Sequence, residues 1–205
     1  MYPLDIHHLN RIIALSLTAV MSCLIGIFVF FKAPRKTINR VFAAYFLAIA
    51  TWSAGDVSLT FAMTHQTALF IVRAAFLGIV TIPLFYLHFV VLLLGLKRPW
   101  AIRIAYTVAF IFLFLIPYPW FVKGASPKSG LPYFTDAGPL FPLFLAYFFI
   151  LVVYGTYQLI KAYRNAIGDQ RGQLKYLLAG TLLGYLGGSP GFLYVFDRII
   201  FPINP

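Results

Sequence analysis

The sequence predicts an all-α protein, a polytopic transmembrane bundle of six helices with its N-terminus outside. Hydrophobic residues make up 61% of the 205-residue chain and charged residues 10%, and the mean hydropathy is +0.88. Soluble globular domains do not have this composition. The apolar residues fall into six stretches, each near the ~20 residues that cross a hydrocarbon core of roughly 30 Å. Positive charge lies mainly on alternate connections between these stretches.

The predicted spans form a single transmembrane domain over residues 1–205, and they cover 12–31, 41–63, 68–94, 101–122, 139–160 and 174–196. Most of the 16 Lys and Arg follow the first, third and fifth spans: Lys32, Arg35, Lys36, Arg40, Lys97, Arg98, Arg103, Lys161, Arg164, Arg171 and Lys175. The positive-inside rule places these three connections in the cytoplasm and both termini outside. Topology and anionic lipid therefore explain the net charge of +11, and we expect no nucleic-acid partner.

The connections are short, which makes consecutive helices antiparallel neighbours. Gly95 is suited to a helix C-terminus and Pro99 to the start of the next helix. The longest connection, 123–138, is rich in Gly, Pro and Ser and predicts an irregular segment or a small hairpin over the bundle mouth. We expect kinks at the prolines inside the predicted spans, which are Pro83, Pro117, Pro119, Pro142 and Pro190.

The sixth span is crowded with glycine. Gly184 and Gly188 match the spacing of small residues that lets transmembrane helices pack closely. The alternative is a flexible hinge at Gly187, Gly188 and Pro190, which would make these residues a structural switch.

Three ionisable residues lie inside predicted spans: Asp56, Arg73 and His88. Such residues are costly in lipid and are candidates for function. Asp56 and Arg73 lie at ~10 Å and ~8 Å from the same outer membrane face, on adjacent spans, so we expect them to form an ion pair. The pair is either a structural clamp or the polar floor of an outward-facing ligand pocket. In the second case Trp52, Tyr133 and Asp136 complete the candidate site.

His88 lies among aromatic residues near the cytoplasmic end of the third span, where a satisfied core or interfacial residue is expected. A proton sensor is the alternative, because imidazole titrates near physiological pH. We expect no metal centre and no cofactor, although the adjacent His7 and His8 leave a weak outer metal site as an alternative.

Residues for catalysis are scarce. The chain has no Glu and only five Asp, and it contains neither a phosphate-binding P-loop nor a serine nucleophile motif. We therefore expect no enzyme activity within these residues.

Several short motifs occur in a characteristic order: Asn39–Phe42 with Trp52, Arg73, Pro83–Phe89 with Gly95, Gly138–Phe141, Arg171–Gln173, Leu177–Gly180 and Gly187–Gly188. In their order and spacing the chain resembles the N-terminal seven-helix sensor region of bacterial histidine kinases, which also precedes some diguanylate cyclases. The resemblance covers nearly the whole chain. It departs at the end, because the chain stops at Phe201–Pro205. The last helix of the family is expected to be missing, either in a fragment or in a natural short form.

The resemblance implies a sensory input domain in the bacterial inner (plasma) membrane. Such a domain detects a small ligand or membrane signal and relays it to a cytoplasmic output domain beyond residue 205. Its expected partners are the lipid bilayer, an unknown small ligand and, in the full-length protein, a second copy in a homodimer. The alternative functions are a small integral-membrane transporter or channel, or a structural subunit of a membrane complex. The absence of a clear internal repeat weighs against a transporter.

Overall fold

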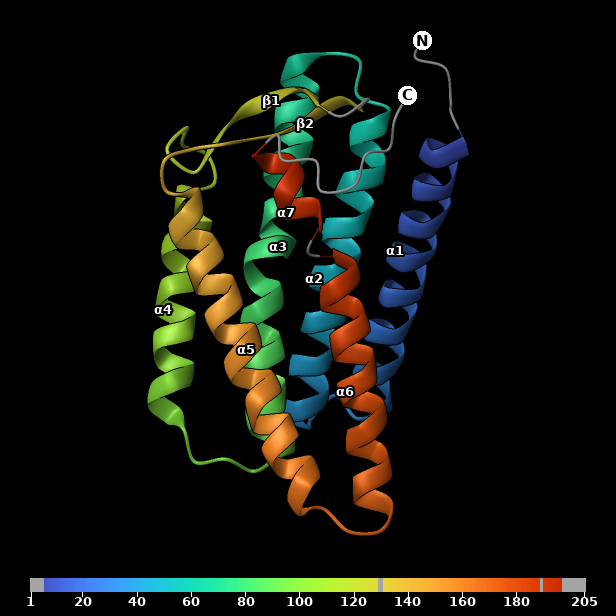
Figure 1. The fold of residues 1–205 in the computed structure, drawn as a ribbon, viewed down its shortest axis with the longest axis vertical. Coiled ribbons are helices and arrows are strands. Elements are labelled where there is room, and N and C mark those ends of the chain that lie inside the picture. Colours follow the sequence, from blue (N-terminus) through green and yellow to red (C-terminus); the bar gives the residue numbers. More distant parts are fainter. Residues whose placement is uncertain (1–5, 129–130, 189, 197–205) are drawn as a thin grey trace.

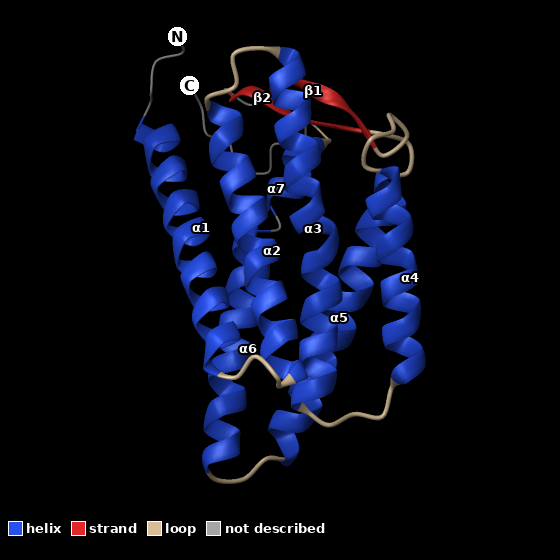
Figure 2. Cartoon of the chain, turned by 180° about the vertical axis from the view of Figure 1, so that it is seen from behind, coloured by secondary structure: helices blue, strands red, loops and turns tan. Residues whose placement is uncertain are grey.

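The computed structural model describes residues 6–128, 131–188 and 190–196, and it confirms the helical bundle (Figure 1). Six helices of 17 to 29 residues stand together, with a β-hairpin and a short helix at one end (Figures 1 and 2). The elements are α1 (Ile6–Lys32), α2 (Thr37–Thr60), α3 (His65–Leu93), α4 (Pro99–Leu115), β1 (Val122–Lys128), β2 (Leu131–Ala137), α5 (Phe141–Asn165), α6 (Asp169–Gly188) and α7 (Pro190–Val195). By length and composition α1, α2, α3 and α5 can each cross a membrane, and α4 is a shorter apolar helix.

Two stretches of the structure differ from the predicted spans. The fourth helix ends at Leu115 instead of continuing to 122, because Pro117 and Pro119 cannot continue it. The sixth predicted span corresponds to two described elements, α6 up to Gly188 and α7 from Pro190. Among the described residues, Pro83 alone lies inside a helix. The other prolines for which we expected kinks stand at or beyond helix ends.

The turn between α3 and α4 follows the expected chemistry. Gly95 has a φ of 61°, a left-handed conformation that costs glycine little. The amide of Leu96 donates to the carbonyl oxygen of Val91 at 3.0 Å, which satisfies one of the last carbonyls of α3. Pro99 then stands in the first turn of α4, where its missing N–H is not needed.

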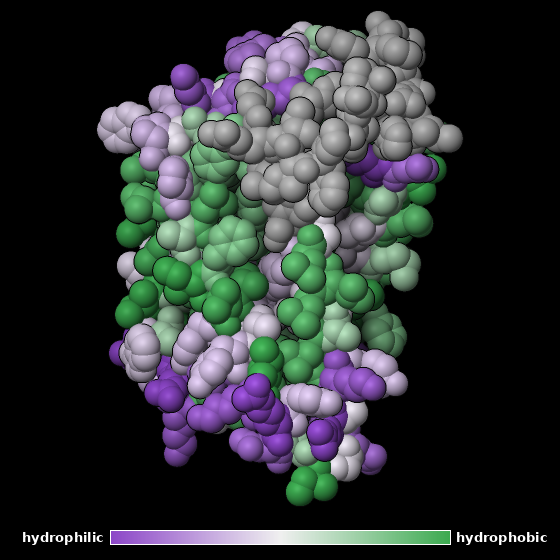
Figure 3. All heavy atoms as spheres, in the orientation of Figure 1, coloured by the Kyte–Doolittle hydropathy of each residue, from purple (hydrophilic) through white to green (hydrophobic). Residues whose placement is uncertain are grey.

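The three basic connections lie at the same end of the bundle. The turns from α1 to α2, from α3 to α4 and from α5 to α6 all lie at the lower end in Figure 1, and the hairpin lies at the other end. Hydrophilic side chains gather at this lower end, below a broad hydrophobic band (Figure 3). The arrangement is the one that the charge pattern requires of a membrane bundle.

Helix α3 is the central helix of the bundle and packs against α2, α4, α5 and both strands. Its outer half is held by an aromatic cluster centred on Phe76. The Phe76 ring lies 5.3 Å from that of Phe121, 5.9 Å from Phe141 and 6.0 Å from Phe144, all edge to face. Edge-to-face rings of this kind contribute about 0.5–1.5 kcal/mol per pair beyond the area they bury. The cluster joins α3, α5 and the chain leading into the hairpin.

Helices α2 and α3 approach each other at two glycines. A Cβ added to Gly78 of α3 would clash with the carbonyl oxygen of Ala48, and one added to Gly55 of α2 would lie 2.5 Å from the Cβ of Ala75. Only glycine allows the two backbones to approach this closely. The face of α2 that carries Gly55 is therefore the face turned toward α3.

The longest connection contains the small hairpin that its composition allowed. Strands β1 and β2 pair antiparallel, with irregular register between Val122 and Gly124 and again between Ser126 and Lys128. The hairpin packs on the outer ends of α2 and α3 and against α7. It covers the end of the bundle opposite the basic connections (Figure 2).

Candidate functional site

The ion pair of Asp56 is with a different arginine from the one that the sequence predicted. A guanidinium nitrogen of Arg11, on α1, lies 3.6 Å from a carboxylate oxygen of Asp56, and the two side chains are 29% and 20% exposed. Among the described residues Asp56 makes no ion pair with Arg73, so the predicted pairing is wrong. The Nε of Arg73 is buried and makes no hydrogen bond within the described chain.

Helix phase explains the error. Gly55 faces α3, and the next residue on a helix points about 100° further round the axis. Asp56 is thereby turned away from α3 and toward α1. The depths estimated from the sequence placed Asp56 and Arg73 at the same level in the membrane. They gave no information on the direction in which each side chain points around its helix axis.

The prediction missed Arg11, which connects three elements at the outer end. Besides its ion pair with Asp56, its guanidinium carbon lies 5.8 Å from the centre of the Phe134 ring on β2, within the range of a cation–π contact. The membrane depth of Arg11 could have indicated it as a partner of Asp56, because Arg11 lies near the outer end of the first span, at the same membrane face as Asp56. Arg11 therefore links α1 both to α2 and to the hairpin.

Trp52 and Asp56 both line a large pocket with a volume of about 640 Å³. Residues four apart on a helix share a face, which places both side chains on the same wall of α2. The remaining walls come from α1, α3, α5, α6, α7 and β2. Pockets of 300–1,000 Å³ are typical of small-molecule sites.

The pocket wall is mainly apolar, with a group of hydroxyl-bearing side chains on one side. The ring of Tyr86 lies 6.0 Å from that of Tyr45 and 5.3 Å from that of Tyr185, so the three rings are in series across α2, α3 and α6. The Tyr86 hydroxyl also forms a hydrogen bond of 3.0 Å with Thr156 of α5. Thr181 of α6 lines the same region. This tyrosine cluster was not predicted, because its members come from helices far apart in the sequence.

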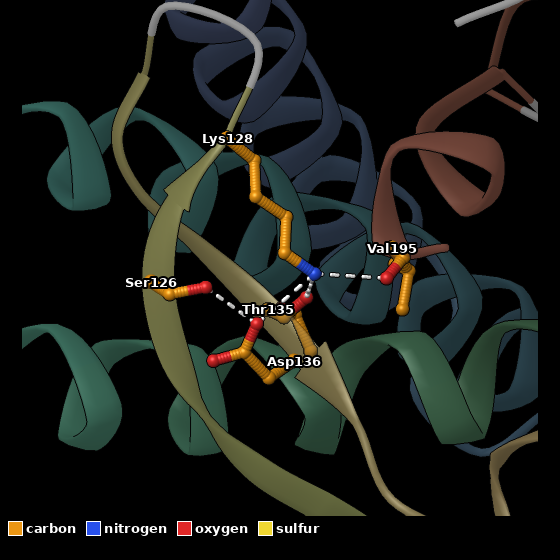
Figure 4. A network of polar contacts seen from close by, with 5 residues as sticks. All are labelled: Ser126, Lys128, Thr135, Asp136 and Val195. Atoms are coloured by element: carbon orange, nitrogen blue, oxygen red, sulfur yellow. Dashed lines mark hydrogen bonds and ion pairs between the residues drawn. The ribbon is translucent and has the colours of Figure 1, made fainter. Parts of the chain in front are cut away.

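Two predicted site residues, Tyr133 and Asp136, lie on β2 and outside the pocket wall. Asp136 accepts hydrogen bonds from Ser126 at 2.6 Å and from Lys128 at 3.0 Å (Figure 4). Their neighbours Phe134 and Thr135 line the pocket instead.

Lys128 joins the hairpin to α7. Its ammonium donates to the carbonyl oxygen of Thr135 at 3.1 Å and to that of Val195 at 2.9 Å, in addition to its contact with Asp136 (Figure 4). The Lys128 side chain is 8% exposed. A buried ammonium with three acceptors is well satisfied, and here it connects β1 with the C-terminal end of α7.

The glycines of α6 do not make the close helix contact that their spacing suggested. A Cβ added to Gly184 or Gly187 would meet no atom of the described residues within 4 Å, and one on Gly188 would lie 3.5 Å from Cη2 of Trp52. Among the helices that the structure describes, Gly184 and Gly188 therefore do not make the expected close contact. These glycines line the pocket at the end of α6, next to Pro190, with which α7 begins.

His88 lies away from this pocket. Its Nδ1 is 2.9 Å from the hydroxyl of Tyr106 on α4, near the end of the bundle that carries Lys97 and Arg98. It is thus a hydrogen-bonded residue between α3 and α4. Among the described residues no group of three or more His, Cys, Asp or Glu is placed to hold a metal ion.

A family model for the N-terminal 7TM region of histidine kinase matches residues 14–204. No curated protein and no solved structure matches the chain. The family accounts for the apolar helices and makes the chain a membrane-embedded sensor region, which is not itself catalytic. Because the match covers nearly the whole sequence, this chain belongs to the family of N-terminal 7TM regions of histidine kinases.

Proposed function

We propose that this domain detects a small ligand in the pocket and relays its binding to a cytoplasmic output domain beyond residue 205. The observation that carries the proposal is the composition of the pocket wall. Part of the wall belongs to the tightly packed pair α2 and α3, and another part belongs to α6 and α7, whose glycines line the pocket. A ligand that fits one arrangement of these two parts better than another shifts the balance between them.

The proposed ligand contacts are Trp52 and Asp56. Both line the pocket, and Trp52 lies against Gly188 at the end of α6. A movement of the indole ring would therefore displace the segment that contains Gly187, Gly188 and Pro190. We propose this segment as the switch. Tyr133 and Asp136 belong to the hairpin at the outer end of the bundle, and Arg73 is on α3; none of the three lines the pocket.

The proposed setting is the plasma membrane of a bacterium. The three basic connections face the cytoplasm, the N-terminus and hairpin face outward, and residues 1–205 act as one domain. In a full-length kinase the output domains would pair in a homodimer.

The test is hydrogen exchange on the full-length protein in lipid nanodiscs, with and without each compound of a small-molecule panel. An active compound slows exchange in 123–138 and around 188–196, and it changes output activity. Trp52→Ala removes both effects. Trp100→Ala is the matched control and keeps them, because Trp100 is exposed on α4, outside the pocket. Uniform exchange across the panel would contradict the proposal, and uptake of the compounds into liposomes would favour a transporter.

A further inference from the structure

A second, more open cavity lies at the basic end of the bundle, between α3 and α4. Its volume is about 580 Å³, and its wall runs from His88 on α3 through Lys97 on the connection to Arg103 on α4. We call it the basic groove. It shares no residue with the pocket of the proposed function, and its whole wall lies in the part of the chain that the structure describes.

The charged residues that line the basic groove are all cations. They are Lys97, Arg98 and Arg103, and all three residues are exposed. With the described part of the chain none of their side chains makes an ion pair or a hydrogen bond. Like charges this close in the sequence repel one another, so an anion that lies among them is stabilised.

The other two basic connections differ, because the chain itself partly engages their cations. Arg40 donates to the carbonyl oxygen of Arg35 at 3.2 Å, and the guanidinium carbon of Arg171 lies 5.2 Å from the centre of the Tyr163 ring. The positive-inside rule accounts for basic residues on all three connections. It does not require that the cations of one connection surround a groove, so this arrangement calls for a ligand.

The floor of the basic groove is apolar. Val91 is buried, and Leu96 and Ile102 are half-buried. His88 lies five residues before Leu93, the last residue of α3, so the groove extends about 7.5 Å from the end of α3 toward the middle of the bundle. That direction leads from the hydrophilic end into the hydrophobic band of Figure 3. A ligand in the groove therefore meets charge at one end and apolar surface at the other.

The apolar surface continues along α4 beyond the groove. Arg103, Tyr106 and Phe110 are three and four residues apart and share one face of the helix. Both aromatic residues are exposed. The hydroxyl of Tyr106 lies 2.9 Å from Nδ1 of His88 and joins α4 to α3 at this level. An extended hydrocarbon chain that leaves the groove can thus lie on the rings of α4.

We propose that the basic groove binds one anionic phospholipid from the leaflet at this end of the bundle. Its phosphate lies among the three cations, and an acyl chain runs over Ile102 toward Tyr106 and Phe110. Basic pockets between transmembrane helices bind phospholipid head groups in this way. A soluble phosphate would leave the apolar floor unfilled, and a zwitterionic lipid would add its own cation to the other three. The inference is independent of the sensor pocket.

The probes are a phosphatidylglycerol and a phosphatidylcholine that carry the same diazirine acyl chain. Each is added in trace amount to the full-length protein in phosphatidylcholine nanodiscs, irradiated, and located by peptide mass spectrometry. The anionic probe is expected to label peptides of 88–110 at least about tenfold more than the zwitterionic one. Equal labelling by the two probes, or labelling outside this segment alone, overturns the inference.

Competition distinguishes a lipid from a free phosphate. Excess unlabelled phosphatidylglycerol is expected to displace the anionic probe. Glycerol 3-phosphate is expected to displace no more of it than sodium chloride at the same ionic strength. Displacement by glycerol 3-phosphate, or none by phosphatidylglycerol, overturns the assignment to a lipid.

Two double variants remove equal charge from the same end of the bundle. Lys97→Gln with Arg98→Gln takes two cations from the groove, and Arg35→Gln with Lys36→Gln takes two from the connection between α1 and α2. One basic residue near an anionic head group contributes roughly fivefold to binding, so labelling is expected to fall roughly 25-fold in the first variant. In the second it is expected to stay within about twofold of wild type, because salt screens charges outside the groove. An equal fall in both variants would mean general attraction to the surface and overturns the inference.

A second pair of variants changes shape and leaves every charge in place. Ile102→Trp fills the apolar floor, whereas Ile104→Trp puts the same ring at an exposed position of α4 outside the groove. Labelling by the anionic probe is expected to fall at least about tenfold in Ile102→Trp, the effect of overpacking a filled site, and to persist in Ile104→Trp. Unchanged labelling in a folded Ile102→Trp overturns the inference. If this variant does not fold, the charge variants decide the question.

Discussion

Replacing Lys128 with Met tests whether the hairpin holds α7 in place. Methionine keeps an apolar stem of similar length but cannot donate a hydrogen bond. The change leaves the carbonyl oxygens of Thr135 and Val195 without the ammonium, whereas Asp136 keeps its hydrogen bond from Ser126. The hairpin itself retains its strand ladder. The effect should therefore be concentrated at α7.

The magnitude follows from the contact with Val195. A hydrogen bond to a charged group contributes about 1.5–3 kcal/mol, and water at this outer end can replace part of it. We take the lower limit, about 1.5 kcal/mol, which corresponds to a roughly tenfold larger population in which α7 is released.

The assay is hydrogen exchange of the chain in nanodiscs. In Lys128→Met the amides of 190–196 are expected to exchange about tenfold faster, with a smaller change in α2 and α3. Lys123→Met is the control, since Lys123 is exposed on the same strand and makes no hydrogen bond or ion pair with the residues that the structure describes. Equal exchange of α7 in wild type and Lys128→Met would refute the reasoning, and so would an equal acceleration in the control.

Two further predictions concern the packing of the helices. Gly78→Ala forces a methyl group against the backbone of α2 and is expected to lower the free energy of unfolding by about 3 kcal/mol. Gly180→Ala places its methyl group in open space and is expected to be neutral or to stabilise the protein by up to ~1 kcal/mol. Thermal unfolding in detergent compares the two variants. In double-mutant cycles of the same stability, Arg11→Ala and Asp56→Ala are expected to show a coupling of at least about 0.5 kcal/mol, and Arg73→Ala with Asp56→Ala to be additive. A larger coupling to Arg73 would contradict the structure.

Hydropathy and charge were enough to predict the bundle. Six apolar stretches and three basic connections predict six helices with the basic connections at one end, and the structure has this arrangement. Helix ends were predicted well where local chemistry decides them, as at Gly95 and Pro99. They were predicted less well where hydrophobicity continued past a proline, as beyond Leu115.

The candidate site was predicted only in part, because depth along a helix can be read from the sequence more easily than rotation about its axis. Depth placed Trp52 and Asp56 in the outer half, and both line the pocket. The partner of Asp56 depended on the phase set by Gly55 against α3, which no single-helix pattern reveals. The tyrosine cluster likewise depends on how α6 is placed against α2 and α3.

The close contact of α2 with α3 has a consequence for how movement is distributed in the domain. Glycines on both helices, Gly55 and Gly78, bring the backbones together, so sliding by one residue would drive a side chain into the opposite main chain. In the proposed function this pair is the fixed reference, and α6 is the helix that moves against it, since added Cβ atoms on Gly180, Gly184 and Gly187 would meet no described atom within 4 Å. A disulfide engineered between α2 and α3 should leave signalling intact, whereas one between α5 and α6 should lock it.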